Sequence, residues 1–250
     1  MKSRPDFSKI KAMKTVFLSD AHLKGLVDDP NQKLLCAFLE GLEGVDTLVI
    51  LGDLFDFWVG FNDVVYYQYL PVLAQLLRLK EKGVKIRYLE GNHDFFMGPF
   101  FTDVLGAEVY PAHIEMELDG KRVFLAHGDM VNRRDYGYRF LRWFLRRRPI
   151  RFIMRNLPSL VWRMAKVMSR GSRQYLGKGF DHDAILFDYA MGKGGYDAVI
   201  LGHSHVPRFE RIMGGMLYVN LGDWITHHTY LVYEDGEFRL ERYERCSPGT

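Results

Sequence analysis

The chain contains the stretch LVILGD at residues 48–53, in which four large apolar residues are followed by a glycine and an aspartate. A short apolar run without polar alternation is typical of a strand buried on both faces, and the glycine ends it. Four other segments repeat this pattern of a strand that ends in polar side chains. They are SDAH at residues 19–22, GNHD at 91–94, HGD at 127–129 and GHSH at 202–205.

Together the five segments supply seven side chains of the kinds that bind divalent metal ions. They are Asp20, His22, Asp53, Asn92, His127, His203 and His205. A carboxylate, amide or imidazole that is buried at a strand end is costly to desolvate if it stays unpaired. A pair of metal ions above one edge of a sheet explains the whole set, and such a site is typical of a hydrolase.

Strand and helix patterns alternate through the first part of the chain. Apolar strands at residues 15–18, 48–51 and 84–89 are separated by helical patterns at 31–43 and 64–82. This order predicts an α/β fold with a parallel sheet, in which ligands gather at the carboxyl ends of the strands. Later strands are expected near 107–109, 113–118, 122–126, 198–201, 216–220, 229–233 and 238–243, with a helix at about 181–191. We therefore expect two sheets packed face to face and flanked by helices.

The composition is typical of a soluble globular protein. Of the 250 residues, 48% are hydrophobic and 26% are charged, so a sizeable core is available. Two cysteines are too few for a disulfide framework and fit a reducing compartment. Residues 1–14 lack the apolar run of a secretory signal, and no stretch reaches the roughly 18 apolar residues of a membrane span. We expect a cytoplasmic protein.

A strongly basic block lies between the two groups of strands. Residues 133–173 hold thirteen Lys and Arg and one acid, a net charge of +12, whereas the remainder holds 21 bases and 30 acids, a net of −9. We interpret residues 131–178 as a helical insertion and residues 1–130 and 179–250 as the core. Nucleic acid and an anionic membrane both suit a basic amphipathic segment. The density of Phe, Ile, Met and Leu favours the membrane and makes nucleic acid unlikely.

The residue types indicate the chemistry of the predicted metals. Mn²⁺ and Mg²⁺ prefer carboxylate and amide oxygens, and imidazole extends the range to Mn, Fe and Zn. A D-x-H turn at a strand end can direct both side chains to one ion, and a single Asp, here Asp53, can bridge two ions. Two ions about 3.5–4 Å apart hold a bridging hydroxide and clamp a phosphoryl group for in-line displacement.

The ordered set resembles the calcineurin-like metallophosphoesterases over about residues 13–130 and 180–235. The resemblance implies a four-layer αββα sandwich, here with a helical insertion cap, and two divalent ions, most simply Mn²⁺ with Fe or Zn as alternatives. It implies one ion held by Asp20, His22, Asp53 and His205, and another held by Asp53, Asn92, His127 and His203. It also implies that His93 acts near the scissile phosphate as a proton donor or electrostatic stabiliser.

Other polar residues near these segments have simpler interpretations. Asp56, Asp94 and Asp129 are expected to shape turns or orient ligands rather than bind metal. His113 and His182 are expected to carry no chemistry. His227 and His228 follow a segment near the closing strands, and their approach to the site stays open.

A closer resemblance is to bacterial UDP-2,3-diacylglucosamine hydrolases. GDLFDFWVG at residues 52–60 is similar to the G-D-L-F-x-x-W-x-G segment of that family, and residues 127–142 match its H-G-D-x5-D-x-G-Y-x3-R run. The resemblance implies hydrolysis of a lipid A precursor to 2,3-diacylglucosamine 1-phosphate and UMP, by attack on the α-phosphorus, at the inner face of the inner membrane. It implies substrate contacts from Asn92, Asp135, Ser172, Lys178 and His203.

Two departures from that family leave the exact lipid open. The best-known branch has Arg where this chain has His93, and an Asn where this chain has residues 174–176. A metallophosphoesterase that acts on another nucleotide or phosphodiester is the alternative. A non-catalytic interaction module on the same fold is disfavoured, because none of the seven metal-ligand positions is lost.

Overall fold

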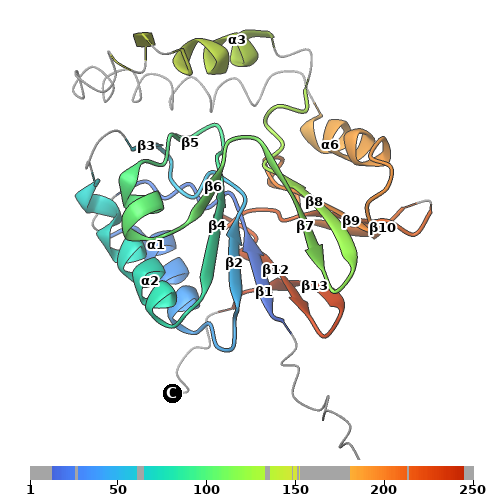
Figure 1. The fold of residues 1–250 in the computed structure, drawn as a ribbon, viewed down its shortest axis with the longest axis horizontal. Helices are drawn as coiled ribbons and strands as arrows, with labels where there is room; N and C mark the ends of the chain where they lie inside the picture. Colours follow the sequence, from blue (N-terminus) through green and yellow to red (C-terminus); the bar gives the residue numbers. More distant parts are fainter. Residues whose placement is uncertain are drawn as a thin grey trace, which may run out of the picture.

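The computed structural model describes residues 13–25, 28–60, 65–132, 136–147, 149–150, 152, 181–212 and 214–244. Two β-sheets lie face to face in this part of the chain, and helices cover their outer faces (Figure 1). Among the described residues, no helix is long and apolar enough to cross a membrane.

The larger sheet has six strands in the order β13-β12-β1-β2-β4-β6. Neighbours among β1, β2, β4 and β6 pair in parallel, and β12 joins β1 antiparallel. The helices α1 (Pro30–Glu40) and α2 (Leu70–Glu81) connect the parallel strands, as predicted. The strands are β1 (Thr15–Leu18), β2 (Thr47–Ile50), β4 (Lys85–Leu89), β6 (Glu108–Tyr110), β12 (Thr229–Glu234) and β13 (Glu237–Arg242).

The smaller sheet has five strands in the order β10-β11-β9-β8-β7. Its central strands β8, β9 and β11 are parallel, so their carboxyl ends lie at one edge. The helix α6 (His182–Met191) leads into β9. The strands are β7 (His113–Leu118), β8 (Lys121–Ala126), β9 (Ala198–Leu201), β10 (Arg208–Arg211) and β11 (Leu217–Asn220).

Side-chain alternation along the buried strands produces the layers. On β1, Val16 and Leu18 belong to the apolar cluster shared with α1 and α2, whereas Phe17 packs in the cluster between the sheets. On β9, Ile200 joins the cluster between the sheets, whereas Val199 packs with residues of α6. The result is helix, sheet, sheet, helix. The predicted four-layer αββα sandwich is confirmed.

A short ribbon and a helix lie at the carboxyl ends of the strands (Figure 1). The ribbon pairs β3 (Trp58–Val59) with β5 (Asp94–Phe95) in parallel. The helix α3 (Tyr136–Leu145) belongs to the predicted insertion, and its last residue, Leu145, packs against Val59 of the ribbon. The later part of the predicted insertion, from residue 153 to 178, lies outside the described residues.

Some element boundaries differ from the sequence-based expectation. The helix expected at 64–82 begins at Leu70, after a 3₁₀ turn at Tyr67–Tyr69, because Pro71 is accommodated in the first helical turn, where no backbone donor is needed. The helix expected at 31–43 ends at Glu40, where the Gly41 N–H caps the preceding carbonyls. The short strands β3, β5 and β10 and a π-helix at Phe100–Val104 were not expected.

Candidate metal centre

The loops that follow the central strands of both sheets are joined by backbone hydrogen bonds. The Asp20 N–H donates to the Gly52 carbonyl at 3.1 Å, and the Gly202 N–H donates to the His127 carbonyl at 2.9 Å. A third bond crosses between the sheets, because the His203 N–H donates to Asp20 Oδ2 at 3.0 Å. The fifth segment joins them through the His93 N–H, which donates to Asp53 Oδ1 at 2.9 Å, so the five ligand-bearing segments meet at one edge of the sandwich.

Five of the seven predicted ligands adopt the left-handed backbone region, which residues with a Cβ rarely occupy. The φ angles are 56° at Asp20, 43° at His22, 52° at Asp53, 70° at His203 and 61° at His205. Such strain persists only where surrounding contacts impose it, and it concentrates at functional sites. The loops are shaped to present these side chains inward.

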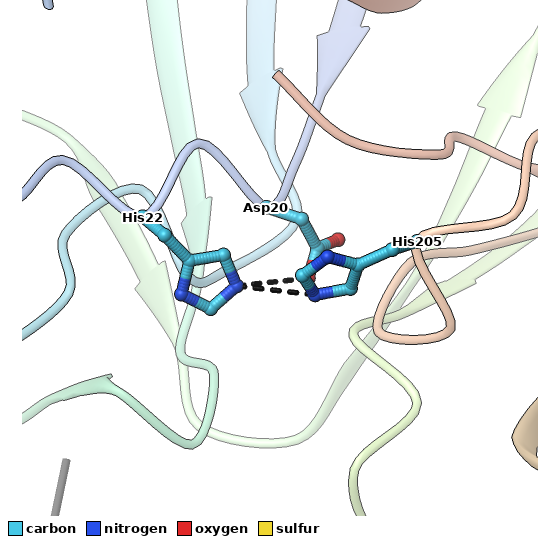
Figure 2. Close-up of side chains that lie close together, drawn as sticks. All are labelled: Asp20, His22 and His205. Atoms are coloured by element: carbon cyan, nitrogen blue, oxygen red, sulfur yellow. Dashed lines mark hydrogen bonds and ion pairs between the residues drawn. The ribbon is translucent and has the colours of Figure 1, made fainter. Parts of the chain in front are cut away.

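Asp20, His22 and His205 form the first cluster, and their side chains point toward one another (Figure 2). His22 Nε2 lies 3.2 Å from His205 Nε2. Asp20 Oδ1 lies 3.4 Å from His205 Nε2 and 3.7 Å from His22 Nε2. Three potential ligand atoms thus converge on one point, although they come from the ends of two different sheets.

Asp53, His127 and His203 form the second cluster, with potential ligand atoms within 4.8 Å of one another. His127 Nε2 lies 3.4 Å from Asp53 Oδ2 and 3.1 Å from Asn92 Oδ1. His127 Nδ1 lies 2.7 Å from the Leu51 carbonyl, to which it donates. That bond leaves the Nε2 lone pair of a neutral imidazole facing the cluster.

Asp53 lies between the two clusters. Its Oδ2 atom is 3.6 Å from His22 Nε2 in the first and 3.4 Å from His127 Nε2 in the second. Its other oxygen, Oδ1, accepts the His93 N–H at 2.9 Å and lies so close to Gly91 that a Cβ there would come within 2.1 Å of it. Glycine at position 91 therefore leaves the space that the central carboxylate occupies.

The sequence matches the family described as calcineurin-like phosphoesterase over residues 13–207, a range that includes both clusters. The chain belongs to the calcineurin-like phosphoesterases.

Individual relatives agree with this assignment. A UDP-2,3-diacylglucosamine hydrolase of Aeromonas salmonicida is 30% identical over 239 residues, which cover 92% of this chain and 93% of the relative. One of Ralstonia nicotianae is 32% identical over 216 residues, covering 78% of this chain and 80% of the relative. Among solved structures, an archaeal phosphodiesterase superposes with a TM-score of 0.49 at 19% identity, covering 92% of this chain and 99% of that one. The family match and the two curated hydrolases confirm the predicted resemblance.

The two clusters fit the divalent ions that calcineurin-like phosphoesterases bind. Within the described part of the chain, the buried Asp20 Oδ1 has no hydrogen-bond donor. It faces two imidazole nitrogens that also face each other. A cation provides a common partner for all three atoms, whereas a single proton does not. The carboxylate, amide and imidazole donors of the second cluster match the same chemistry.

The electrostatics of the phosphoesterase site keep its carboxylates ionised. Burial opposes the charged form of Asp20, but the nearby imidazoles of His127 and His205 outweigh it and lower its pKa to about 2. Burial also opposes the charged form of Asp53, but nearby imidazoles, chiefly that of His127, outweigh it. The pKa of Asp53 therefore lies well below its usual value. Conversely, burial disfavours the charged form of His127, but Asp53 and Asp20 raise its pKa well above the usual value. Burial and the charge of His127 lower the pKa of His203 to about 4.

His93 stands beside the first cluster without being one of the predicted ligands. Its ring lies edge-on to the His22 ring, with centroids 4.8 Å apart. Its Nδ1 atom lies 2.9 Å from the Asp56 carbonyl, so a donated hydrogen bond there leaves Nε2 as an acceptor. His93, His22 and Asp53 also form a third group whose potential ligand atoms lie close together. The geometry therefore permits both a catalytic role and a ligand role.

The carboxylates beside the ligands shape the loops. Asp94 accepts the backbone N–H groups of Asp53 at 2.9 Å and Leu54 at 2.7 Å, and also the Tyr88 hydroxyl. Burial and the charge of Asp53 raise the pKa of Asp94 to about 7. Asp94 therefore holds the turn that presents Asp53 rather than facing the clusters.

Sequence reasoning missed Asp223 as part of the site. Asp223 follows β11, and its Oδ1 accepts three successive N–H groups, from Ile225, Thr226 and His227. Its Oδ2 lies 3.7 Å from His205 Nδ1 and 3.3 Å from His227 Nδ1. A carboxylate in this position orients a metal-binding imidazole. The signal was present, since NLGDW at residues 220–224 is one more strand end followed by a glycine and a carboxylate.

The remaining predicted residues lie at different distances from the clusters. His227 approaches the first cluster through Asp223, and the His182 ring lies edge-on to the His203 ring, with centroids 5.4 Å apart. His113, which pairs with Ala126 in the smaller sheet, stacks on Phe124. Of the predicted substrate contacts, Asn92 and His203 are in the second cluster. Asp135, Ser172 and Lys178 lie outside the described residues.

Proposed function

We propose that this phosphoesterase hydrolyses the pyrophosphate bond of UDP-2,3-diacylglucosamine to give 2,3-diacylglucosamine 1-phosphate and UMP, a step of lipid A biosynthesis. The observation that carries the proposal is similarity to curated hydrolases of this substrate over 92% of the chain. That coverage extends beyond the metal-binding core into the insertion proposed at residues 131–178.

The two clusters divide the metal-binding residues between two ions. Divalent ions supply positive charge that draws phosphate oxygens and lowers the pKa of nearby water. We assign Mn²⁺, with Fe or Zn as alternatives, because the donors combine carboxylate, amide and imidazole groups. One ion is assigned to Asp20, His22, Asp53 and His205, and the other to Asp53, Asn92, His127 and His203.

The protein groups around the clusters bind and orient the substrate. His93 stabilises charge on the phosphate or, when its ring carries a proton on both nitrogens, donates the proton of Nε2, because Nδ1 is committed to the Asp56 carbonyl. Asn92 and His203 contact the substrate phosphate from the second cluster. Asp135, Ser172 and Lys178 are assigned to the rest of the substrate, on the basis of the sequence motif alone.

The insertion is proposed as a cap for the acyl chains and as the contact with an anionic membrane. The support is α3, whose outer side carries exposed aromatic rings. Phe140 is 64% exposed and Trp143 is 51% exposed, and their stacked rings lie 5.7 Å apart. Such a surface suits a lipid boundary better than nucleic acid. The protein is accordingly assigned to the cytoplasm, peripherally bound to the inner membrane.

Turnover of the lipid substrate tests the proposal. Purified protein is assayed with UDP-2,3-diacylglucosamine and Mn²⁺, with a chelator control and the His205→Ala variant to exclude a contaminating hydrolase. We expect UMP release that needs metal, with kcat/KM at least 100-fold above that for a soluble dinucleotide pyrophosphate. Equal or better turnover of the soluble compound would assign the enzyme to another nucleotide or phosphodiester substrate.

A further inference from the structure

The basic face of α3 points toward the metal centre. Arg142 donates to the Asp129 carboxylate, and Arg146, the residue that directly follows α3, donates to the Glu90 carboxylate. Both acceptors are buried, since Glu90 is 5% exposed and Asp129 is 8% exposed. A buried carboxylate that loses its partner is strongly destabilised, so each pair holds the helix firmly at this position.

The two carboxylates stand beside ligands of the second cluster. Asp129 follows His127 by two residues, and Glu90 precedes Asn92 by two residues. Arg142 also approaches the Gly91 carbonyl at 3.5 Å, within the same segment as Glu90 and Asn92. One arginine therefore reaches both loops that supply the second cluster.

Glu90, which precedes the Asn92 loop, also contacts the residue that follows it. Its Oε1 atom accepts the Phe96 N–H at 2.7 Å, while Oε2 receives Arg146. The Arg146 guanidinium also lies 5.4 Å from the centre of the Phe96 ring. The loop at residues 91–95 is thus held at both ends by contacts that include an arginine of the α3 segment.

The first cluster is held by other parts of the fold. Asp20 Oδ2 accepts the His203 N–H across the sheets, and His205 Nδ1 faces Asp223, which follows β11. These contacts come from β1, β9 and β11. A change in how α3 packs on the core therefore displaces the loops of the second cluster first.

We propose that Arg142 and Arg146 are positioning residues through which the docking of α3 sets the geometry of the second metal cluster. The inference rests on the metallophosphoesterase function and deepens it, because it couples the cap to one of the two metal sites. Removing either arginine releases a ligand loop, so affinity falls most at the second site, while Asp20 and His205 of the first cluster keep their contacts with the His203 N–H and Asp223.

The test is a two-site Mn²⁺ titration of the full-length metal-free protein, by calorimetry or chelator competition. For Arg142→Met we expect one Mn²⁺ equivalent to bind about 10- to 100-fold more weakly, the usual effect of losing a residue that orients metal ligands. The other equivalent should stay within threefold of wild type. With the soluble diester bis(p-nitrophenyl) phosphate at saturating Mn²⁺, kcat should fall while KM changes little.

Arg147→Met is the matched control, because Arg147 is the next residue, is exposed and packs over the Trp143 ring at 3.7 Å. It should leave both Mn²⁺ equivalents unchanged. Arg142→Lys and Arg146→Gln cover the case in which Arg142→Met does not fold, and each should weaken one equivalent. Equal weakening of both equivalents, or none in any variant, would overturn the inference. Absence of UDP-lipid turnover by wild type would overturn the proposed substrate instead, and the titration would still decide the role of the arginines.

Discussion

His22 Nε2 lies 3.2 Å from His205 Nε2, and both residues have a left-handed backbone. Two imidazoles that face each other through the same nitrogen share at most one proton, and the nearby Asp20 Oδ1 adds a negative charge. The loops thus hold three electron-rich atoms together before any ion binds. This preorganisation favours the binding of a cation, because folding has already overcome the energetic penalty of the strained backbone.

Asp53→Ala should be the most damaging single change among the metal ligands. Asp53 Oδ2 lies within 3.6 Å of imidazole nitrogens in both clusters, so its loss removes a ligand from each assigned ion. We expect activity to fall at least as far as in His22→Ala, and bound metal to be lost. Metal analysis by mass spectrometry after gel filtration gives the readout. A variant with two bound ions and near-normal turnover would exclude the bridging assignment.

His93→Ala should separate catalysis from metal binding. Because Nδ1 is bonded to the Asp56 carbonyl, Nε2 is the ring atom that we assign to the substrate. We expect both ions to stay bound while kcat falls about 10²- to 10⁴-fold, the range for a positioned acid–base or electrostatic group. Metal content and single-turnover rates are measured on the same preparation. Loss of an ion would instead make His93 a ligand, together with His22 and Asp53.

Metal affinity should depend on pH in a direction set by the histidines. In the metal-free protein the carboxylates outweigh burial and raise the pKa values of His22 and His127, so these rings still hold protons where a free histidine has lost them. The pKa of His203 is lowered to about 4, so it carries none at neutral pH. Metal must displace the protons of His22 and His127, and its apparent affinity should rise with pH until both have titrated. Calorimetry in buffers of different ionisation enthalpy should show proton release at pH 7 that decreases in His127→Asn.

The strands that position the ligands could be predicted because each one has, in its own few residues, the apolar pattern of a buried strand. Residues 16–18 and 198–201 are uninterrupted apolar runs that end in the ligand-bearing segments, and both lie in fully buried strands. The strand at Arg208–Arg211 was missed because it is polar and largely exposed, and it exists through its pairing with β11. Asp223 was missed for a related reason. The strand-end pattern at residues 220–224 marks its position, but its contact with His205 depends on β11 lying beside β9, which no local pattern reports.

Gly91→Ala should disrupt the site although the change is one methyl group. The added Cβ would lie 2.1 Å from Asp53 Oδ1 and 2.7 Å from the Asp53 nitrogen, so the central carboxylate must move. We expect loss of bound metal and a fall of about 1–3 kcal/mol in the free energy of unfolding, as for other overpacked sites. Gly194→Ala is the matched control, because a Cβ there meets open space. Chemical denaturation and metal analysis should leave the control unchanged, and equal effects in both variants would refute the steric explanation.

The exposed side of α3 should anchor the protein to anionic vesicles. Phe140 stacks with Trp143 and Phe144 on this side, and Arg147 packs over Trp143, so rings and charge are presented together. Arg146 is unsuitable for the test because it pairs with the buried Glu90, and its loss would disturb the metal centre as well.

Trp143→Ala combined with Arg147→Glu should therefore reduce sedimentation with anionic vesicles at low salt. The variant should raise KM for the diacyl substrate more than it lowers turnover of a soluble diester. Tyr67→Ser is the control, since Tyr67 is 75% exposed and belongs to the 3₁₀ turn before α2 rather than to α3. Wild-type binding should weaken as salt screens the attraction to anionic headgroups. If the double variant and wild type sediment alike at low salt, α3 is not the membrane contact, and its aromatic rings serve the acyl chains of the substrate alone.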